Sequence, residues 1–148
     1  MIMGMIVDQV YQFKKKYPFT VAWRLKRNAT IVEKHLNPDE KVLYAFPAQK
    51  SNQPLQIFHT CVVALTNRRI LIGRDRVVVG YFLDAITPDM FNDLKVVAGL
   101  LWGRVLIDTI REHVVLSHLD KKSLDEIETA ITTHMMEEKK KYNSYKNN

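Results

Sequence analysis

The stretch IFHTCVVALTNRRILIGRDRVVVGYFL, residues 57–83, has the alternation of apolar and polar positions that decides the fold. Alternate residues from His59 to Leu65 fall on one face, as expected of a β-strand. Two short segments rich in turn-forming residues divide the stretch into three strands. The predicted order is a strand at 57–66, a turn at 66–68, a strand at 70–72, a turn at 73–76 and a strand at 77–83.

The same period of two extends in both directions from this stretch, over residues 41–119. Further strands are predicted at 41–48, 91–97, 104–109 and 112–116. Seven short strands separated by regular turns are typical of an antiparallel barrel or sandwich. Parallel β-α-β units are excluded, because no segment long enough for a crossover helix lies between the strands.

Residues 1–36 have helical periodicity and predict two helices. Apolar residues recur every three or four positions from Met3 to Phe13, and a second apolar stripe runs from Ala22 to Leu36. A break at Tyr17-Pro18-Phe19 separates the two, since the residue before proline is disfavoured in a helix. Thr20 is the expected N-cap of the second helix.

The chain is expected to end in a third helix. Ser123-Leu-Asp-Glu126 matches a capping box, and an apolar stripe follows from Leu124 to Met135. From Lys139 to Asn148 we expect a frayed, solvated tail. The predicted organisation is an N-terminal helical extension at 1–36, a barrel domain at 37–136 and a charged tail at 137–148.

Two of the predicted strands, 41–48 and 77–83, are apolar on both faces, whereas a strand that is buried on one side only alternates. The N-terminal helices are the available cover for these outer faces. The predicted fold class is therefore α+β: a seven-stranded antiparallel barrel or sandwich, capped by a C-terminal helix, with two helices packed outside.

Composition and charge narrow the class of protein. The chain has 148 residues, 47% of them hydrophobic, and its single cysteine, Cys61, fits a reducing compartment. No apolar run approaches the roughly 18 residues that span a bilayer, so we expect a soluble, cytoplasmic protein. The net charge of +6 is concentrated in residues 1–36, which hold seven Lys or Arg and two acidic residues. This basic segment can attract an anionic partner.

Few residues are candidates for catalysis or metal binding. Cys61 shares a face with Val63 and is expected in the core, and no acidic residue nearby completes a triad with His59. His113 and His118 are five residues apart, so their side chains point to opposite faces of a strand. One cysteine provides no closed zinc set. We expect no enzymatic activity, no catalytic residue, no bound metal and no cofactor.

Several stretches resemble the bacterial pleckstrin-homology-like family of the YokE type, over about residues 33–136. They are Glu33-Lys-His-Leu36 with PDEKVL at 38–43, VALTNRRILI at 63–72, and the turn at 99–103 with Val105-Leu-Ile107. The most specific part is ALTNRRILI. The resemblance implies a curved pair of orthogonal sheets with the final helix closing one open end, and no established catalytic role.

The resemblance does not imply a phosphoinositide site. Relatives that bind inositol phosphates cluster Lys and Arg around the first hairpin, whereas residues 48–57 offer only Lys50 here. Arg68 and Arg69 lie at one end of the predicted third strand, and Arg74 and Arg76 lie at the other. Arginines at these places are typical of hairpin ends.

Apolar residues in the connection at 96–103 point instead to an interaction surface. Leu100, Leu101 and Trp102 lie where connections are usually polar, so this tip either folds back onto the barrel or is presented to a partner.

Two binding functions remain open. The leading one is a non-enzymatic binding module for protein interaction or self-assembly, a homo-oligomer included. The alternative is peripheral binding to an anionic membrane through the basic N-terminal helix, with Trp102 as an anchor. Nucleic acid is not expected as a partner, since no helix-turn-helix or aromatic platform motif is present. The candidate contact residues are Trp23, Arg24, Lys26, Arg27, Lys34, Leu100, Leu101 and Trp102.

Overall fold

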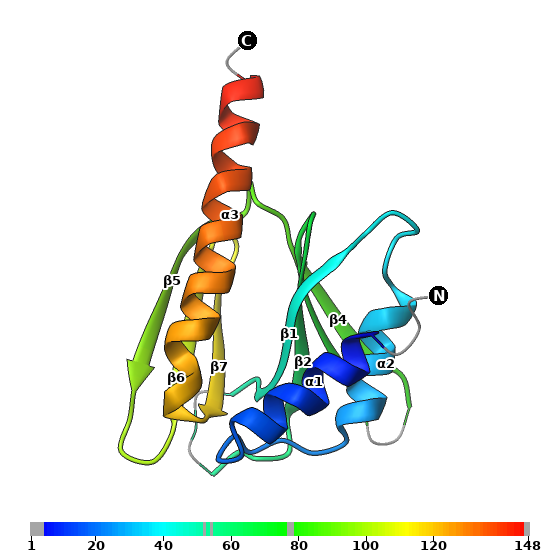
Figure 1. The fold of residues 1–148 in the computed structure, drawn as a ribbon, viewed down its shortest axis with the longest axis vertical. Helices are drawn as coiled ribbons and strands as arrows, with labels where there is room; N and C mark the ends of the chain where they lie inside the picture. The colour runs from blue at the N-terminus through cyan, green and yellow to red at the C-terminus, as the bar shows by residue number, and fades with distance from the viewer. Residues whose placement is uncertain (1–4, 52, 54, 77–78, 147–148) are drawn as a thin grey trace.

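The computed structural model describes residues 5–51, 53, 55–76 and 79–146 (Figure 1). Helices α1 (Met5–Lys16) and α2 (Leu25–Lys34) precede the strands, and a 3-10 turn, η1 (Lys121–Ser123), leads into α3 (Leu124–Lys146). The strands are β1 (Val42–Gln49), β2 (Thr60–Thr66), β3 (Ile70–Asp75), β4 (Tyr81–Ile86), β5 (Phe91–Ala98), β6 (Gly103–Thr109) and β7 (His113–Leu119).

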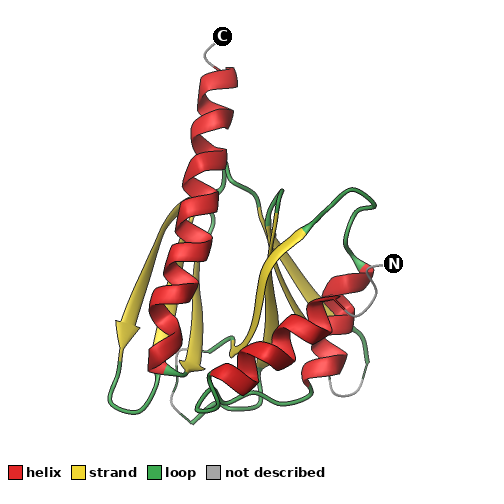
Figure 2. Cartoon of the chain, in the orientation of Figure 1, coloured by secondary structure: helices red, strands yellow, loops and turns green. Residues whose placement is uncertain are grey.

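The seven strands form one antiparallel sheet in the order β4-β3-β2-β1-β7-β6-β5. The sheet bends into two halves, which meet where Gln49 of β1 pairs with Ser117 of β7. Figure 2 shows α3 lying along the β5–β7 half and continuing past it, while α1 and α2 pack on the outside of the other half. The predicted fold class is confirmed.

The main core fills the space between the two halves of the sheet and α3. Its largest fully buried members come from strands in both halves and from the final helix: Phe46, Ile70, Phe91, Ile107, Leu116, Leu119, Ile127, Ile131 and Met135. Cys61 belongs to this core, as predicted, and burial raises the pKa of its thiol to about 12.

A second core lies between the N-terminal helices and the outer face of β1–β3. Val32 of α2 and Val10 of α1 pack there with Ala45 of β1 and Leu71 of β3. The predicted cover for the first strand is therefore confirmed.

Gly73 allows α2 to approach the sheet closely. A Cβ at this position would lie 2.6 Å from Cγ2 of Val32. The predicted turn at 73–76 is wrong, because Gly73 lies in β3, where the absence of a side chain leaves room for α2. The reversal comes later, where the Arg76 N–H donates to the Gly80 carbonyl (3.0 Å) and Gly80 has a φ of +83°.

The fourth strand differs from the prediction in position and in cover. It runs from Tyr81 to Ile86 in place of 77–83, and Val77 and Val78 lie outside the described residues. Leu83 and Ala85 of this strand pack against the second core, so part of the expected helical cover is present, whereas Tyr81 is about half exposed. The reason is that α2 lies mainly over β2 and β3.

The segment between α1 and α2 has no helix or strand, and the prediction that Thr20 caps a helix is wrong. The Thr20 hydroxyl accepts a hydrogen bond from the Asp120 N–H (3.0 Å), and the Val21 N–H donates to the His118 carbonyl (2.9 Å). These contacts hold the segment against the end of β7. The helix begins at Leu25, after Arg24 with a φ of 52°.

The start and end of α3 also differ from the prediction. Asp120 caps η1 by accepting from the Lys122 N–H, and the Ser123 hydroxyl donates to the Asp120 carbonyl, so the predicted Ser123–Glu126 capping box is wrong. Glu126 is instead engaged by Lys16 and Tyr44. The helix continues to Lys146, which contradicts a tail frayed from residue 139. Met3 and residues 147–148 lie outside the described part, and the division into three segments stays a prediction.

Candidate interaction surface

Three connections meet at one end of the sheet. The Trp23 N–H donates to the Thr60 hydroxyl at the start of β2 (3.1 Å), and its indole N–H donates to the Ile57 carbonyl (2.9 Å), which ties the α1–α2 segment to the β1–β2 loop. The Trp102 indole N–H donates to the Phe19 carbonyl (3.0 Å), which ties the same segment to the β5–β6 turn. We call the surface formed by the described residues of 19–24, 50–59 and 99–102 the loop-end face.

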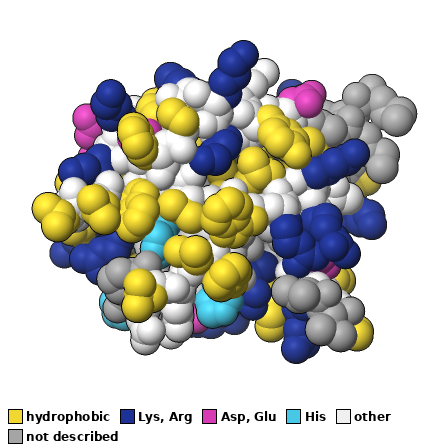
Figure 3. Space-filling model, turned by 90° about the horizontal axis from the view of Figure 1, so that it is seen from below, with side chains coloured by type: hydrophobic (Ala, Val, Ile, Leu, Met, Phe, Trp, Pro, Cys, Tyr) yellow, Lys and Arg dark blue, Asp and Glu magenta, His cyan; other side chains and the backbone are white. Residues whose placement is uncertain are grey.

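Large apolar side chains remain exposed on the loop-end face. Their relative exposure runs from 50% to 92%, and they are Phe19, Trp23, Leu55, Phe58, Leu100 and Leu101. Figure 3, seen from below Figure 1, shows apolar side chains forming a band across this face, with Lys and Arg beside it. Soluble monomers seldom expose apolar side chains in such a contiguous group.

The tip predicted from the β5–β6 connection is divided between two roles. Leu100 and Leu101 are 91% and 67% exposed. Trp102 folds back, with its indole N–H bonded to Phe19 and its ring 5.0 Å from that of His118. Trp102 is therefore held against the chain, whereas Leu100 and Leu101 are exposed to solvent.

A groove of about 490 Å³ opens beside this tip. Its lining residues come from the β1–β2 loop, the β5–β6 turn, β6 and β7: Gln53, Gly99, Leu100, Leu101, Trp102, Arg104, Ser117 and His118. His118 is buried and has a φ of 61°, an uncommon backbone conformation for a residue with a side chain. The Val21 N–H and the Trp102 ring both contact His118, so the neighbouring segments hold this conformation.

The predicted basic residues do not form one surface. Arg24 and Arg27 both pair with Asp75, at 2.9 and 3.1 Å, so one of their two positive charges is compensated within the chain. Lys26 is exposed in the first turn of α2, near the loop-end face. Lys34 lies in the last turn of the same helix, towards the other end of the sheet.

Trp23 lies on the loop-end face, and its side chain is half exposed. Its indole N–H donates to the Ile57 carbonyl (2.9 Å), and its ring lines a small hollow of about 220 Å³ together with Phe58. Both tryptophans of the chain are thus held by internal hydrogen bonds.

Sequence reasoning missed Phe19, Leu55 and Phe58. Each lies in a segment with proline or other turn-forming residues, as Leu100 does. A large apolar residue among turn-forming residues could therefore have indicated an exposed site in these segments too. What the sequence could not reveal is that these three segments meet on one face.

Among its described residues, the first hairpin has no cluster of cations that could bind several phosphates. Lys50 pairs with Asp84 of β4, so its charge is compensated. Within the described residues, no three His, Cys, Asp or Glu side chains are placed to hold a metal ion. None of the described helices combines the length and apolar character needed to cross a bilayer.

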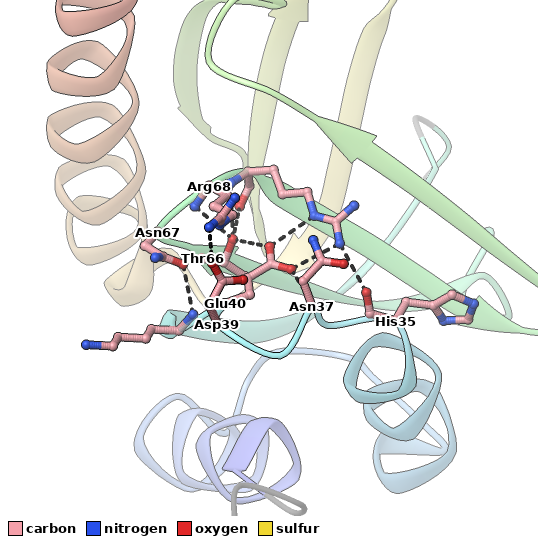
Figure 4. A network of polar contacts seen from close by, with 9 residues as sticks. His35, Asn37, Asp39, Glu40, Thr66, Asn67 and Arg68 are labelled. Carbon is pink, nitrogen blue, oxygen red and sulfur yellow. Dashed lines mark hydrogen bonds and ion pairs between the residues drawn. The ribbon is translucent and has the colours of Figure 1, made fainter.

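The opposite end of the sheet holds a buried polar network. Figure 4 shows Glu40 pointing between Asn37 and Thr66. Arg69 donates to both carboxylate oxygens of Glu40 at 3.0 Å, and the Thr66 hydroxyl donates at 2.6 Å. The Asn37 N–H adds a bond of 3.1 Å, and Arg69 also donates to the His35 carbonyl (3.0 Å).

The pKa of Glu40 reflects this network. Burial raises the pKa of the carboxyl, but hydrogen bonds from Arg69, Thr66 and Asn37 outweigh burial and leave it below its usual value. Within the stretch ALTNRRILI, Thr66 and Arg69 therefore have a structural role. Arg68 pairs with the exposed Asp39.

Fold and surface together define a class of protein: a PH-like sheet closed by its C-terminal helix, with an exposed apolar face on its loops. The family model described as Bacterial PH domain matches residues 36–133, well over half of the chain. The chain belongs to the bacterial PH domain family. No curated protein and no solved structure matches it. The YokE type stays a prediction.

Proposed function

We propose that this chain is a non-enzymatic binding module that uses the loop-end face for protein interaction or self-assembly. PH domains are in general binding modules, which supports the class. The observation that carries the proposal is the group of six large apolar side chains left exposed on three connections. On a scale of about 150–250 Å² for a buried aromatic side chain, they present on the order of 700 Å². A standard protein interface buries about 800 Å² on each partner.

The chemistry of the described residues supports a binding role over catalysis. The thiolate is the reactive form of cysteine, and the Cys61 thiol is fully buried with a pKa of about 12. His118 is packed against Trp102. We propose no catalytic residue and no cofactor, and a cytoplasmic location remains a prediction.

The alternative function is peripheral binding to an anionic membrane. The exposed Trp23 and Lys26 near the loop-end face favour it, because aromatic and cationic side chains together suit a membrane interface. The pairing of Arg24 and Arg27 with Asp75 weakens it. Co-sedimentation with phosphatidylcholine and phosphatidylglycerol vesicles at low salt tests this function, and equal pelleting with both would contradict it.

A photo-crosslinking amino acid in place of Leu100 tests the proposed function in cells. Ile110 is the matched control position, since it is 64% exposed in the β6–β7 turn, away from the loop-end face. We expect protein adducts from position 100 and none of the same mass from position 110. An adduct with the mass of two chains would indicate self-assembly, and a different mass another protein. No adduct, or the same adducts from both positions, would contradict the proposal.

A further inference from the structure

Among the occupants that the loop-end face can accept, we propose an acidic amphipathic segment of another protein. Its apolar side chains enter the groove beside Trp102, and its carboxylates meet the Lys and Arg side chains around the apolar band. This inference rests on the proposed function and names the partner of the same face.

The size of the groove beside Trp102 suits a bound segment. The groove of about 490 Å³ falls in the usual range of ligand pockets, roughly 300–1,000 Å³. Leu100 and Leu101 line it together with Trp102, which is held from two sides by Phe19 and His118. A wall that is rigid before binding lowers the entropy lost on association. Apolar side chains of a partner can therefore enter a site that is already formed.

The two tryptophans favour a protein over a lipid surface. At a membrane interface, the indole N–H of tryptophan usually lies at the polar, wet side of the ring. Here the indole N–H groups of Trp23 and Trp102 donate to the Ile57 and Phe19 carbonyls. These rings present apolar surface to a partner and keep their donors within the chain.

The charges around the face favour an acidic partner. The Lys121 ammonium donates to the Leu100 carbonyl (3.0 Å), at the edge of the groove, and Lys122 beside it is exposed. Arg74 lines the neighbouring hollow with Trp23, and Arg24 is paired there with Asp75. Asp120 accepts from the backbone N–H groups of Phe19 and Lys122 and is buried, so its carboxylate is not presented at the surface. Figure 3 shows far more Lys and Arg than acidic side chains on this view.

A second copy of the chain fits the face less well. A two-fold contact places the same surface against itself. Lys121 and Lys122 of both copies would then surround one apolar contact, and like charges placed together across an interface disfavour it by several kcal/mol. An acidic segment provides apolar contact without this repulsion.

Two labelled helical peptides test the inference by fluorescence anisotropy with the full chain. Both carry leucines at positions i, i+3, i+4 and i+7, and their polar positions are all Glu in one and all Lys in the other. We expect the Glu peptide to bind about tenfold tighter or more, as a few charge pairs across an interface can supply. The double variant Leu100→Ser/Leu101→Ser should weaken it about tenfold, and Lys121→Glu/Lys122→Glu should remove the preference. Ile110→Ser is the control and should change nothing.

Equal affinities for the two peptides, no binding of the Glu peptide, or binding that survives Leu100→Ser/Leu101→Ser would overturn the acidic partner. Two parallel measurements identify the other occupants. Pelleting with phosphatidylglycerol vesicles that is lost in the leucine variant would assign a lipid surface, and a leucine-dependent dimer in sedimentation velocity would assign a second copy. If the Glu peptide fails and position 100 still gives adducts, only the partner is wrong. If both fail, the proposed function is wrong as well.

Discussion

The two ends of β1 differ in which kinds of side chain are buried and which are exposed. Near Val42, which pairs with Thr66, the carboxylate of Glu40 is buried among donors from Arg69, Thr66 and Asn37. Beyond Gln49, which pairs with Thr60, leucines and aromatic rings point into solvent. One end buries charge where a core is normally apolar, and the other exposes apolar side chains where loops are normally polar.

This difference separates stability from binding. A buried carboxylate with several donors holds the α2–β1 connection against the β2–β3 turn, so its removal should be felt in folding. Exposed leucines contribute little to folding because folding does not take them out of water. Their contribution comes when a partner covers them. Four predictions test this separation, in order of expected effect.

Glu40→Ala should produce the largest loss. It leaves Arg69, which is mostly buried, without its carboxylate, and breaking a buried ion pair in this way costs roughly 3–5 kcal/mol. We expect a fall of about 3 kcal/mol in the free energy of unfolding, measured by urea denaturation with an unchanged m-value. Asp39→Ala is the control, because its pair with Arg68 is exposed and should contribute less than about 1 kcal/mol. Equal losses would contradict the distinction between the two pairs.

Acid should produce a smaller, graded loss through the same residue. The pKa of Glu40 is lower in the folded chain than its usual value, so the unfolded chain binds more protons as the pH falls. The contribution of this carboxylate is therefore complete above about pH 4.3 and is lost as the pH falls through the folded pKa. Urea denaturation between pH 6 and pH 3 should show a shallower pH dependence in Glu40→Gln. An unchanged slope would assign the acid sensitivity to other carboxyl groups, such as Glu126.

Trp102→Phe should have a moderate effect on both properties. It removes the donor to the Phe19 carbonyl and keeps most of the ring, so we expect a loss of about 1 kcal/mol in the free energy of unfolding. The groove also loses a fixed wall, so the Glu peptide should bind more weakly. Trp23→Phe removes a similar bond to Ile57 outside the groove and should lower stability without the same loss of affinity. Identical binding by the two variants would argue against the groove.

Leu100→Ser/Leu101→Ser should have the smallest effect on folding. Both side chains are largely exposed, so we expect a change within about 0.5 kcal/mol, as for ordinary surface substitutions. Calorimetric or urea unfolding beside the peptide titration would show stability retained and affinity lost. Leu116→Ser, at a fully buried position, provides the contrast and should lose several kcal/mol. A marked destabilisation by the exposed pair would mean that these leucines serve the fold.

Local periodicity was a good guide to the strands and to the core. The alternation through Cys61 and Val63 predicted their burial, and the doubly apolar first strand predicted its helical cover. These predictions succeeded because a side chain's face follows from its position along a regular strand. The prediction of the fourth strand was wrong because β3 continues through Gly73 to Asp75 and β4 begins only at Tyr81.

Capping motifs in the sequence predicted the starts of the helices poorly, because contacts with distant segments determine which hydrogen bonds these residues make. Thr20 accepts from Asp120, one hundred residues away, and Glu126 is engaged by Lys16 and Tyr44. A local motif only offers a hydrogen-bonding group, and the tertiary structure selects its partner. The candidate site shows the same limit: Leu100 and Leu101 were picked out as apolar residues in a turn, but the sequence did not show that Phe19 and Phe58 lie on the same face.

By itself, the amino-acid sequence determined the seven antiparallel strands, the helices at both ends and the burial of the lone cysteine, because those features depend on residue order along one element. Only the tertiary structure decided where the helices begin, which carboxylates are neutralised by arginine, and that three separate connections join in one apolar face. Such features depend on distances between segments that are far apart in the chain, and no local pattern encodes those distances.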